Sequence, residues 1–276
     1  MTQPARKKTA LSDILEGGAK LGFHHIVVFL RITAPLILPV SAVLIAVAAW
    51  RASSSGSNLL ADAILVSVAV INVLAAMLAG GACMVAAAEA SRGTKPNARA
   101  AIGFVLGRAS RVIYLVTLLV IAIAPAIAML VLPGLKVLGG YASLLLIPAL
   151  FSLWLTANWA VALPAMLEEK IGIVDSLRRS VQLVHGSFGR ALGTVVLGGT
   201  LALFAGALVA ILFSIFSIGS ENVASAVLRI GFALGELFVA PFFAAFLVVL
   251  YRDLLDRQQG SSPDRTSHRG EHSTSS

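Results

Sequence analysis

Four polar side chains inside long apolar runs are the residues of this sequence whose chemistry most needs an explanation. They are Arg31, Asn72, Asn158 and Glu236. Placing such groups away from water is costly, so they either hold helices together through hydrogen bonds or form a binding or transport site. We expect Arg31 to reach back to the water interface and the other three to hydrogen-bond between helices, with a transport site as the alternative.

Glu236 is the only acidic side chain well inside one of these runs. It and Asn72 both lie about nine residues, or ~14 Å at the rise of an α-helix, from the same membrane face. No Lys or Arg stands at a comparable depth, so desolvation favours the neutral carboxyl group. We therefore predict a hydrogen bond between Glu236 and Asn72.

The other acidic residues are too dispersed to form a hydrolytic centre. Metal-dependent phosphodiester hydrolysis needs carboxylates that converge on a metal ion, with His for proton transfer. Asp62 and Glu221 are expected on one membrane face, and on the other the acids stand at helix ends beside basic residues, where ion pairs explain them: Glu89, Glu168, Glu169 and Asp253. His268 and His272 stand four apart in a polar tail without further ligands nearby. We expect no catalytic residue, cofactor or metal site, and we expect Cys83 to be a small core residue.

The composition identifies a membrane protein. Hydrophobic residues make up 58% of the 276 residues and charged residues only 12%, with a mean hydropathy of +0.92. Soluble domains carry about 25% charged residues, so the apolar residues here must face lipid. The net charge of +8 could indicate nucleic acid, but the basic residues form short groups between apolar runs. Membrane topology explains them, and we predict no nucleic-acid partner.

Six apolar runs have the ~20 residues that a helix needs to cross a bilayer. They occupy residues 26–50, 63–88, 112–132, 142–167, 191–218 and 227–251. The runs are apolar on every face, which excludes the alternating pattern of a membrane β-barrel. Prolines inside the runs, Pro164 among them, predict kinks. We predict an all-α integral membrane domain at 10–257, with a flexible tail at 1–9 and a disordered tail at 258–276.

The distribution of basic residues predicts the orientation. Seventeen of the 21 Lys and Arg residues precede the first run or follow the second, fourth or sixth, whereas only Arg51, Lys136 and Arg229 lie on the opposite side. The positive-inside rule then places both termini in the cytoplasm. The first run is too long for a signal peptide, so we expect it to stay in a bacterial inner (plasma) membrane.

Three cytoplasmic intervals combine an apolar helical period with basic residues. We predict amphipathic helices at the inner interface near residues 11–21, 99–111 and 174–190. Their cations are candidate contacts for anionic phospholipid headgroups: Lys20, Arg108, Arg111, Arg178, Arg179 and Arg190. Aligning Leu21, Leu106 and Leu183 superposes three units of interfacial helix plus transmembrane hairpin, approximately 10–92, 96–171 and 172–257. This alignment predicts a threefold internal repeat, although any amphipathic-then-apolar protein aligns loosely with itself.

Small residues recur every four positions along the fifth run. They are Thr194, Gly198, Ala202, Gly206, Ala210 and Ser214. Such a stripe lets another helix approach closely. Candidate partners are the fourth run, through Ser152, Thr156 and Ala160, and the second run, through Ala76 and Gly80. A homo-oligomer could use the same stripe, but a six-helix bundle must fill its own centre first.

Three stretches resemble a known bacterial family. They are residues 160–169, centred on Leu163-Pro164-Ala165; residues 175–188, which begin Asp175-Ser176-Leu177-Arg178-Arg179; and residues 240–255, which end Leu250-Tyr251-Arg252-Asp253-Leu254-Leu255. The chain resembles the six-helix proteins named for the membrane domain attached to some glycerophosphoryl diester phosphodiesterases. The resemblance implies a six-helix layout over 10–257. It implies no chemistry, because most members stand without the phosphodiesterase domain and their activity is not established. Only 19 residues follow Arg257, so we expect no catalytic domain there.

These observations leave three classes of function. The first is a non-enzymatic integral membrane protein that interacts with or organises lipid, with its basic helices drawn to anionic headgroups. The second is a transporter or channel for a small solute or lipid, for which repeats and broken helices are suited but charged pairs at mid-membrane are sparse. The third is an accessory subunit that holds an unidentified membrane partner.

Overall fold

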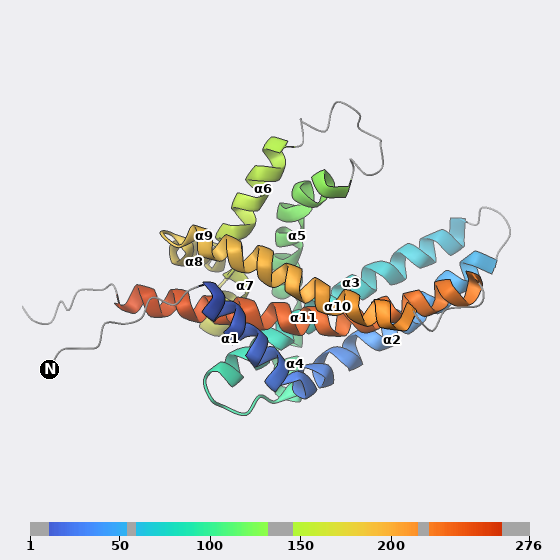
Figure 1. Ribbon diagram of the computed structural model, residues 1–276, viewed down its shortest axis with the longest axis horizontal. Helices are drawn as coiled ribbons and strands as arrows, with labels where there is room; N and C mark the ends of the chain where they lie inside the picture. Colours follow the sequence, from blue (N-terminus) through green and yellow to red (C-terminus); the bar gives the residue numbers. More distant parts are fainter. Residues whose placement is uncertain (1–10, 54–58, 132–145, 215–220, 261–276) are drawn as a thin grey trace, which may run out of the picture.

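The structure is a computed structural model that describes residues 11–53, 59–131, 146–214 and 221–260 (Figure 1). In these ranges the regular elements are helices and no strand is present, which confirms the all-α prediction there. In chain order the elements are α1 (Leu11–His24), α2 (Ile26–Ser53), α3 (Leu59–Ser91), α4 (Ala98–Leu106), α5 (Ala109–Val131), α6 (Leu146–Trp159), α7 (Ala162–Glu169), α8 (Ile173–Val184), α9 (Phe188–Gly193), a π-helical turn (Thr194–Gly198), α10 (Gly199–Ser214) and α11 (Glu221–Gly260). The predicted tail at 1–9 lies outside the described residues. Of the predicted disordered tail at 258–276, residues 258–260 belong to α11 and 261–276 lie outside the described residues.

Six helical stretches are long and apolar enough to cross a membrane, which confirms the predicted number. They are Ile26–Trp50, Leu59–Ser91, Ala109–Ala126, Leu146–Glu169, Phe188–Val209 and Leu234–Gln259. The largest difference is at the C-terminal end, where α11 continues nine residues beyond the predicted 227–251 run. The helix continues because Leu250 and Leu254 are both buried, one turn apart, and Arg257 pairs with Asp253 at i,i+4.

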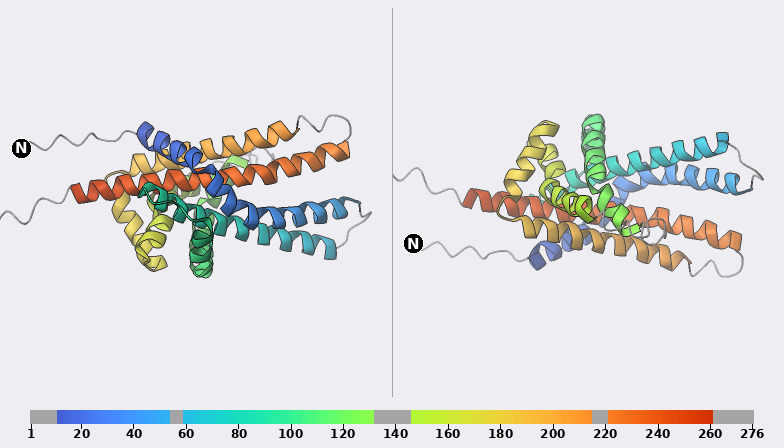
Figure 2. Two further views of the ribbon diagram at one scale, coloured as in Figure 1. Left: turned by 90° about the horizontal axis from the view of Figure 1, so that it is seen from below. Right: turned by 90° about the horizontal axis from the view of Figure 1, so that it is seen from above.

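The long helices form three antiparallel hairpins, of which one diverges from the other two. The α2–α3 and α10–α11 hairpins lie side by side, with α11 packed against both α2 and α3 (Figures 1 and 2). The α5–α6 hairpin points away from them. Val112 and Leu115, near the start of α5, are buried and Val112 packs over Gly81 of α3, whereas Ile121 and Phe151 farther along the hairpin are exposed. The described helices therefore do not make the closed six-helix bundle that the sequence suggests.

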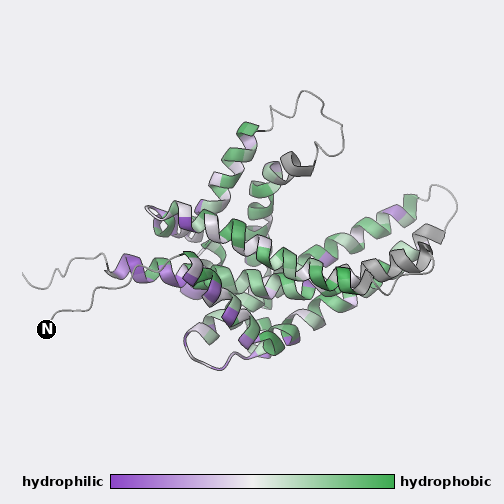
Figure 3. Ribbon diagram, viewed as in Figure 1, coloured by the Kyte–Doolittle hydropathy of each residue, from purple (hydrophilic) through white to green (hydrophobic). Residues whose placement is uncertain are grey.

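Three short amphipathic helices gather at one end of the long helices. Figure 3 shows hydrophilic residues concentrated there and apolar residues along the hairpins. In chain order α1, α4 and α8 each precede a pair of long helices. The helix predicted for residues 11–21 is present as α1. Three of the predicted interfacial cations lie outside these helices, since Arg108 is in the turn after α4, Arg111 is in the first turn of α5 and Arg190 is in α9.

The helix α1 packs tightly on α11 through two glycines. Gly18 faces Phe246 and Gly22 faces Phe242, and a Cβ atom at Gly18 would overlap the Phe246 ring. Glycine therefore allows a backbone approach that no side chain would permit. The four-residue spacing of Gly18 and Gly22 is a small-residue motif that the sequence analysis did not use.

Two predicted spans are not continuous α-helices. The fourth breaks between α6 and α7, at residues 160–161, just before Pro164. Pro164 has no N–H to donate to the carbonyl of Ala160, which explains a break at this point. The fifth span contains the π-helical turn Thr194–Gly198, where the backbone takes an extra residue per turn.

Candidate functional site

A chain of hydrogen bonds between side chains crosses three membrane helices. Ser41 Oγ on α2 donates to Asn72 Oδ1 on α3 at 2.9 Å, and Asn72 Nδ2 donates to Glu236 Oε2 on α11 at 3.3 Å. The Asn72–Glu236 hydrogen bond that their matching depth predicts is therefore present. Ser41 and Asn72 are buried, whereas Glu236 is exposed on the surface of its helix. Hydrogen bonds of this kind contribute roughly 0.6 kcal/mol each to helix association.

The sequence predicts that the Asn158 side chain hydrogen-bonds to another helix, but among the described residues its amide group donates within its own helix. Its Nδ2 donates to the carbonyl of Trp154, one turn back in α6, at 2.8 Å. Its own carbonyl accepts from Ser180 Oγ of α8 at 2.7 Å. Asn158 precedes the α6–α7 break, where the backbone carbonyls lose their usual donors, so the Ser180 hydroxyl replaces a missing backbone N–H. Asn158 is therefore part of the junction between α6 and α8.

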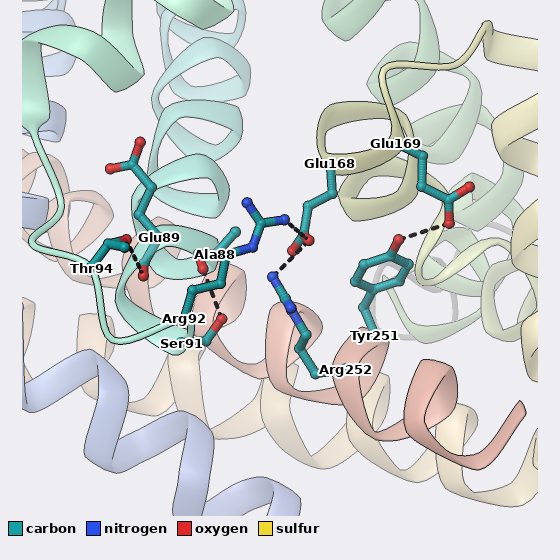
Figure 4. Close-up of polar contacts among 9 residues, drawn as sticks. All are labelled: Ala88, Glu89, Ser91, Arg92, Thr94, Glu168, Glu169, Tyr251 and Arg252. Atoms are coloured by element: carbon teal, nitrogen blue, oxygen red, sulfur yellow. Dashed lines mark hydrogen bonds and ion pairs between the residues drawn. The ribbon is translucent and has the colours of Figure 1, made fainter. Parts of the chain in front are cut away.

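A buried carboxylate joins three helices at the polar end of the molecule (Figure 4). Glu168, at the end of α7, accepts from Arg92 at 2.5 Å and from Arg252 at 2.7 Å, and both guanidinium groups meet the same oxygen, Oε2. The Glu168 side chain is only 9% exposed, so it depends on these partners. Its Oε1 atom and Arg252 Nε are buried without a hydrogen-bond partner in the described part of the chain. The ion pairs expected for Glu168, Glu169 and Asp253 are confirmed, whereas Glu89 accepts from the backbone N–H of Asn97 and forms no ion pair in the described part of the chain.

The neighbouring contacts extend this arginine–carboxylate cluster along α11. Glu169 Oε1 accepts from Tyr251 Oη at 2.8 Å, which Figure 4 shows, and from Arg179 Nε at 3.0 Å. Asp253 Oδ2, one residue past Arg252, accepts from Arg190 at 3.0 Å and from Arg257 at 2.9 Å. In these contacts five guanidinium groups face three carboxylates. The cluster binds α3, α7, α8, α9 and α11 together and leaves an excess of positive charge.

The six predicted headgroup contacts have three different environments. Arg179 and Arg190 belong to the arginine–carboxylate cluster, so their charges are already paired within the chain. Lys20, Arg111 and Arg178 are exposed and form no ion pair with a described residue. The guanidinium of Arg108 lies over the Phe104 ring, 4.1 Å from its centroid. Three of the six cations are therefore available to an external anion.

Arg31 lines a cavity of about 670 Å³ between α2 and the α3–α4 connection. Lys95 and Arg99 line the same cavity, and the sequence analysis did not connect these three cations. An adjoining cavity of about 420 Å³ shares Lys95 and includes His25. Burial lowers the pKa of His25, and the neighbouring His24 imidazole lowers it further. The signal that could have found this group is the short basic interval 92–99 opposite an arginine near the inner end of the first span.

The stripe of small residues packs against α11, and the predicted partners in the second and fourth spans are wrong. Thr194, Gly198, Ala202 and Gly206 are buried, whereas the side-chain surroundings of Ala210 and Ser214 lie outside the described residues. A Cβ atom at Gly206 would lie 3.1 Å from the carbonyl oxygen of Gly235, and one at Gly235 would lie 2.6 Å from the carbonyl oxygen of Gly206. The missed signal was a second small-residue motif, Gly231-Phe232-Ala233-Leu234-Gly235, in the adjacent helix of the hairpin.

Among the described residues no three His, Cys, Asp or Glu side chains lie close enough together to hold a metal ion, and Cys83 is buried as a free thiol. Comparison of the chain with protein-family models, with curated proteins and with solved structures returned no match.

Proposed function

We propose that this chain is a non-enzymatic, multi-pass protein of a bacterial inner membrane that interacts with and organises lipid. Both termini lie in the cytoplasm in this proposal, so the polar end with α1, α4 and α8 faces the inner leaflet. The observation that carries the proposal is the presence there of the exposed, unpaired cations Lys20, Arg111 and Arg178. A basic residue near an anionic membrane surface contributes about 1 kcal/mol of attraction.

We also propose that the chain consists of three copies of one unit, each an interfacial helix followed by a transmembrane hairpin. The order of the helices supports this, because α1, α4 and α8 each stand before two long helices. The proposed membership in the six-helix family related to the glycerophosphoryl diester phosphodiesterase membrane domain rests on the sequence resemblance. Three basic interfacial helices in one chain would present anionic lipids with three similar contacts around one protein.

The lipid proposal is tested by reconstituting the protein with spin-labelled phosphatidylglycerol or phosphatidylcholine and measuring the immobilised fraction of each lipid. We expect the wild-type protein to prefer phosphatidylglycerol and to lose this preference as salt is raised. The combined variant Lys20→Gln, Arg111→Gln and Arg178→Gln should lose most of the preference without a change in melting temperature. Equal immobilisation of both lipids by the wild-type protein at low salt would contradict the proposal.

Arg178 and Arg179 supply a matched control, because they are adjacent on α8 but differ in their partners. Arg178 is exposed and unpaired, whereas Arg179 holds Glu169 and Gln258. Arg178→Gln should therefore reduce lipid preference and leave stability unchanged. Arg179→Gln should lower the melting temperature and change lipid preference less. If both variants behave alike, the distinction between paired and free cations is wrong.

A transport role is the second candidate, and the exposed carboxyl group of Glu236 favours it. Glu236 stands within a membrane-spanning helix and is hydrogen-bonded on one side to Asn72. An ionisable side chain at that depth is a common feature of solute and proton pathways. A Glu236→Gln variant that folds normally but loses a cellular phenotype would favour transport over lipid organisation.

A further inference from the structure

We infer that the cavity lined by Arg31, Lys95 and Arg99 is a binding site for a phosphate ester, which in the membrane is the headgroup phosphate of a phospholipid. The cavity, of about 670 Å³, lies between the start of α2 and the connection from α3 to α4. No acidic residue lines it. This inference rests on the proposed lipid function and assigns that function a particular site.

The three cations have no partner within the described part of the chain. Arg31, Lys95 and Arg99 are exposed, and none of them forms an ion pair there. This contrasts with the arginine–carboxylate cluster, where each guanidinium has a carboxylate. The acid nearest in sequence, Glu89, accepts through Oε2 from the backbone N–H of the cavity-lining Asn97 at 3.2 Å but forms no ion pair with the three cations. The cavity therefore keeps three uncompensated positive charges.

The loop that carries Lys95 has a fixed shape. At the end of α3 the N–H of Thr94 donates to the carbonyl of Glu89, and the N–H of Gly93 donates to that of Ala90. Gly93 has a φ of +74°, which closes the helix end in the left-handed conformation that glycine adopts easily. Thr94 Oγ1 also donates to the Glu89 carbonyl at 2.7 Å. Lys95 is therefore presented by an ordered turn.

The next helix is fixed in the same way. Asn97 Oδ1 caps α4 by accepting from the N–H groups of Arg99 and Ala100 at 3.1 and 3.3 Å. The start of α4, with its positive dipole end, thus adjoins the cavity that Arg99 lines. Guanidinium groups donate two parallel hydrogen bonds to phosphate oxygens, and Lys supplies a compact charge. Arg31 and Arg99 would hydrogen-bond to one phosphate group from two helices, and Lys95 would neutralise its charge.

The depth of Arg31 indicates a lipid as the source of the phosphate. Arg31 is five residues into the first span, or about 8 Å from its inner end along the helix axis, so its long side chain reaches the headgroup level. Val28, Pro35 and Ile102 line the same cavity and offer an apolar wall to the glycerol backbone and the first acyl carbons. A soluble phosphate ester would use the cations alone, and a phospholipid would use the wall as well.

The test measures how strongly the purified full-length protein in neutral detergent binds phosphatidylglycerol, phosphatidylcholine and glycerol 3-phosphate, by native mass spectrometry. The site variant combines Arg31→Gln, Lys95→Gln and Arg99→Gln. The control is Lys170→Gln, which removes an exposed cation after α7 that neither lines this cavity nor belongs to the three headgroup contacts Lys20, Arg111 and Arg178. We expect the site variant to bind the first phosphatidylglycerol at least tenfold more weakly and the control less than threefold. Circular dichroism checks folding, and Lys95→Gln alone, in an exposed loop, serves if the combined variant does not fold.

Each outcome decides between the site and the wider function. Binding of glycerol 3-phosphate as tight as that of the lipid, and lost in the site variant, supports the phosphate site but makes a soluble ester its ligand. A wild-type preference for phosphatidylglycerol that the site variant keeps in full overturns the site and leaves the lipid function standing. Equal wild-type binding of phosphatidylglycerol and phosphatidylcholine overturns the preference for anionic lipid, and if the site variant then binds both lipids as tightly as the wild type, the site is overturned as well.

Discussion

Replacing Gly235 by Ala tests how closely α10 and α11 approach. The new Cβ atom would lie 2.6 Å from the carbonyl oxygen of Gly206, and a normal contact begins near 3.4 Å. The carbonyl oxygen is a backbone atom and the Cβ atom is bonded directly to the backbone, so neither can rotate away. The two helices must therefore separate by about 0.8 Å to relieve the overlap. Overpacking of this kind costs about 1–3 kcal/mol, and Ala recovers about 1 kcal/mol through its helix propensity. We expect Gly235→Ala to lower the free energy of unfolding by up to about 2 kcal/mol.

Gly80 offers a matched control on another membrane helix, α3. A Cβ atom there would have no neighbour within 4 Å, so Gly80→Ala gains helix propensity without overlap. We expect it to raise the free energy of unfolding by roughly 0.5–1 kcal/mol. The two substitutions are chemically identical, so the gain in helix propensity cancels and their difference of about 1–3 kcal/mol isolates the contact between the helices.

Gly206→Ala should lie between these two variants. Its Cβ atom would meet Val239 Cγ2 at 2.6 Å, a side-chain atom that can move more easily than backbone, and the Gly235 carbonyl oxygen at 3.1 Å. Gly206→Leu should be much more severe, because the overlap grows with volume. The assay is unfolding in detergent followed by helical circular dichroism. Equal stability of Gly235→Ala and Gly80→Ala would refute the close approach, and the stripe would then face lipid.

Three further predictions concern topology, Glu236 and pH. A reporter that is active only in the cytoplasm should give signal when fused after residues 95, 169 and 259 but not after 55, 139 and 220, and one reversed pair would contradict the six-span topology. Glu236→Gln keeps a hydrogen bond to Asn72 and should change the free energy of unfolding by less than ~0.5 kcal/mol. Glu236→Lys should abolish accumulation of the protein in the membrane. Normal levels of the Glu236→Lys protein would show that the site tolerates charge. Because the pKa of His25 in the folded protein lies below 6.5, the unfolded state binds more protons, and the free energy of unfolding should fall as the pH falls through and below about 6.5. His25→Asn should make the free energy of unfolding depend less on pH in this range. An unchanged pH dependence would assign the effect to other groups.

The sequence predicts those features of the fold that depend on composition over many residues. Apolar length predicts the six spans, apolar period predicts the helix at Leu11–His24, and position along the spans predicts the matching depth of Asn72 and Glu236. None of these requires knowledge of which segments pack together. The break between α6 and α7 was foreseen only as a kink at Pro164. The Ser180 hydroxyl that supports this break comes from a different helix, so no local pattern indicates it.

Features that depend on contacts between distant segments were missed or assigned to the wrong partner. The stripe on the fifth span has the correct chemistry, but its partner is α11, because Gly235 provides a second small residue opposite Gly206. Arg179 and Arg190 have the composition of headgroup contacts but meet Glu169 and Asp253 instead. The cavity at Arg31 brings together residues more than 60 positions apart. In each case the residue types were visible and the pairing was not.

The length of α11 has a mechanical consequence. Its 40 residues extend for ~60 Å, about twice the ~30 Å hydrocarbon core, so one rod connects the middle of the membrane with the water beyond it. Gly235 fits against Gly206 about 21 Å from the start of this rod, and Arg252 holds Glu168 about 26 Å farther along it. Sliding the helix by one residue would turn it by about 100° and break both contacts at once, so piston motion is opposed at two points. Pro241, which lacks an N–H, lies between them and is the place where the rod bends most easily. A bend at Pro241 moves the contact of Gly235 with Gly206 relative to the arginine–carboxylate cluster. The two contacts are therefore mechanically coupled through α11.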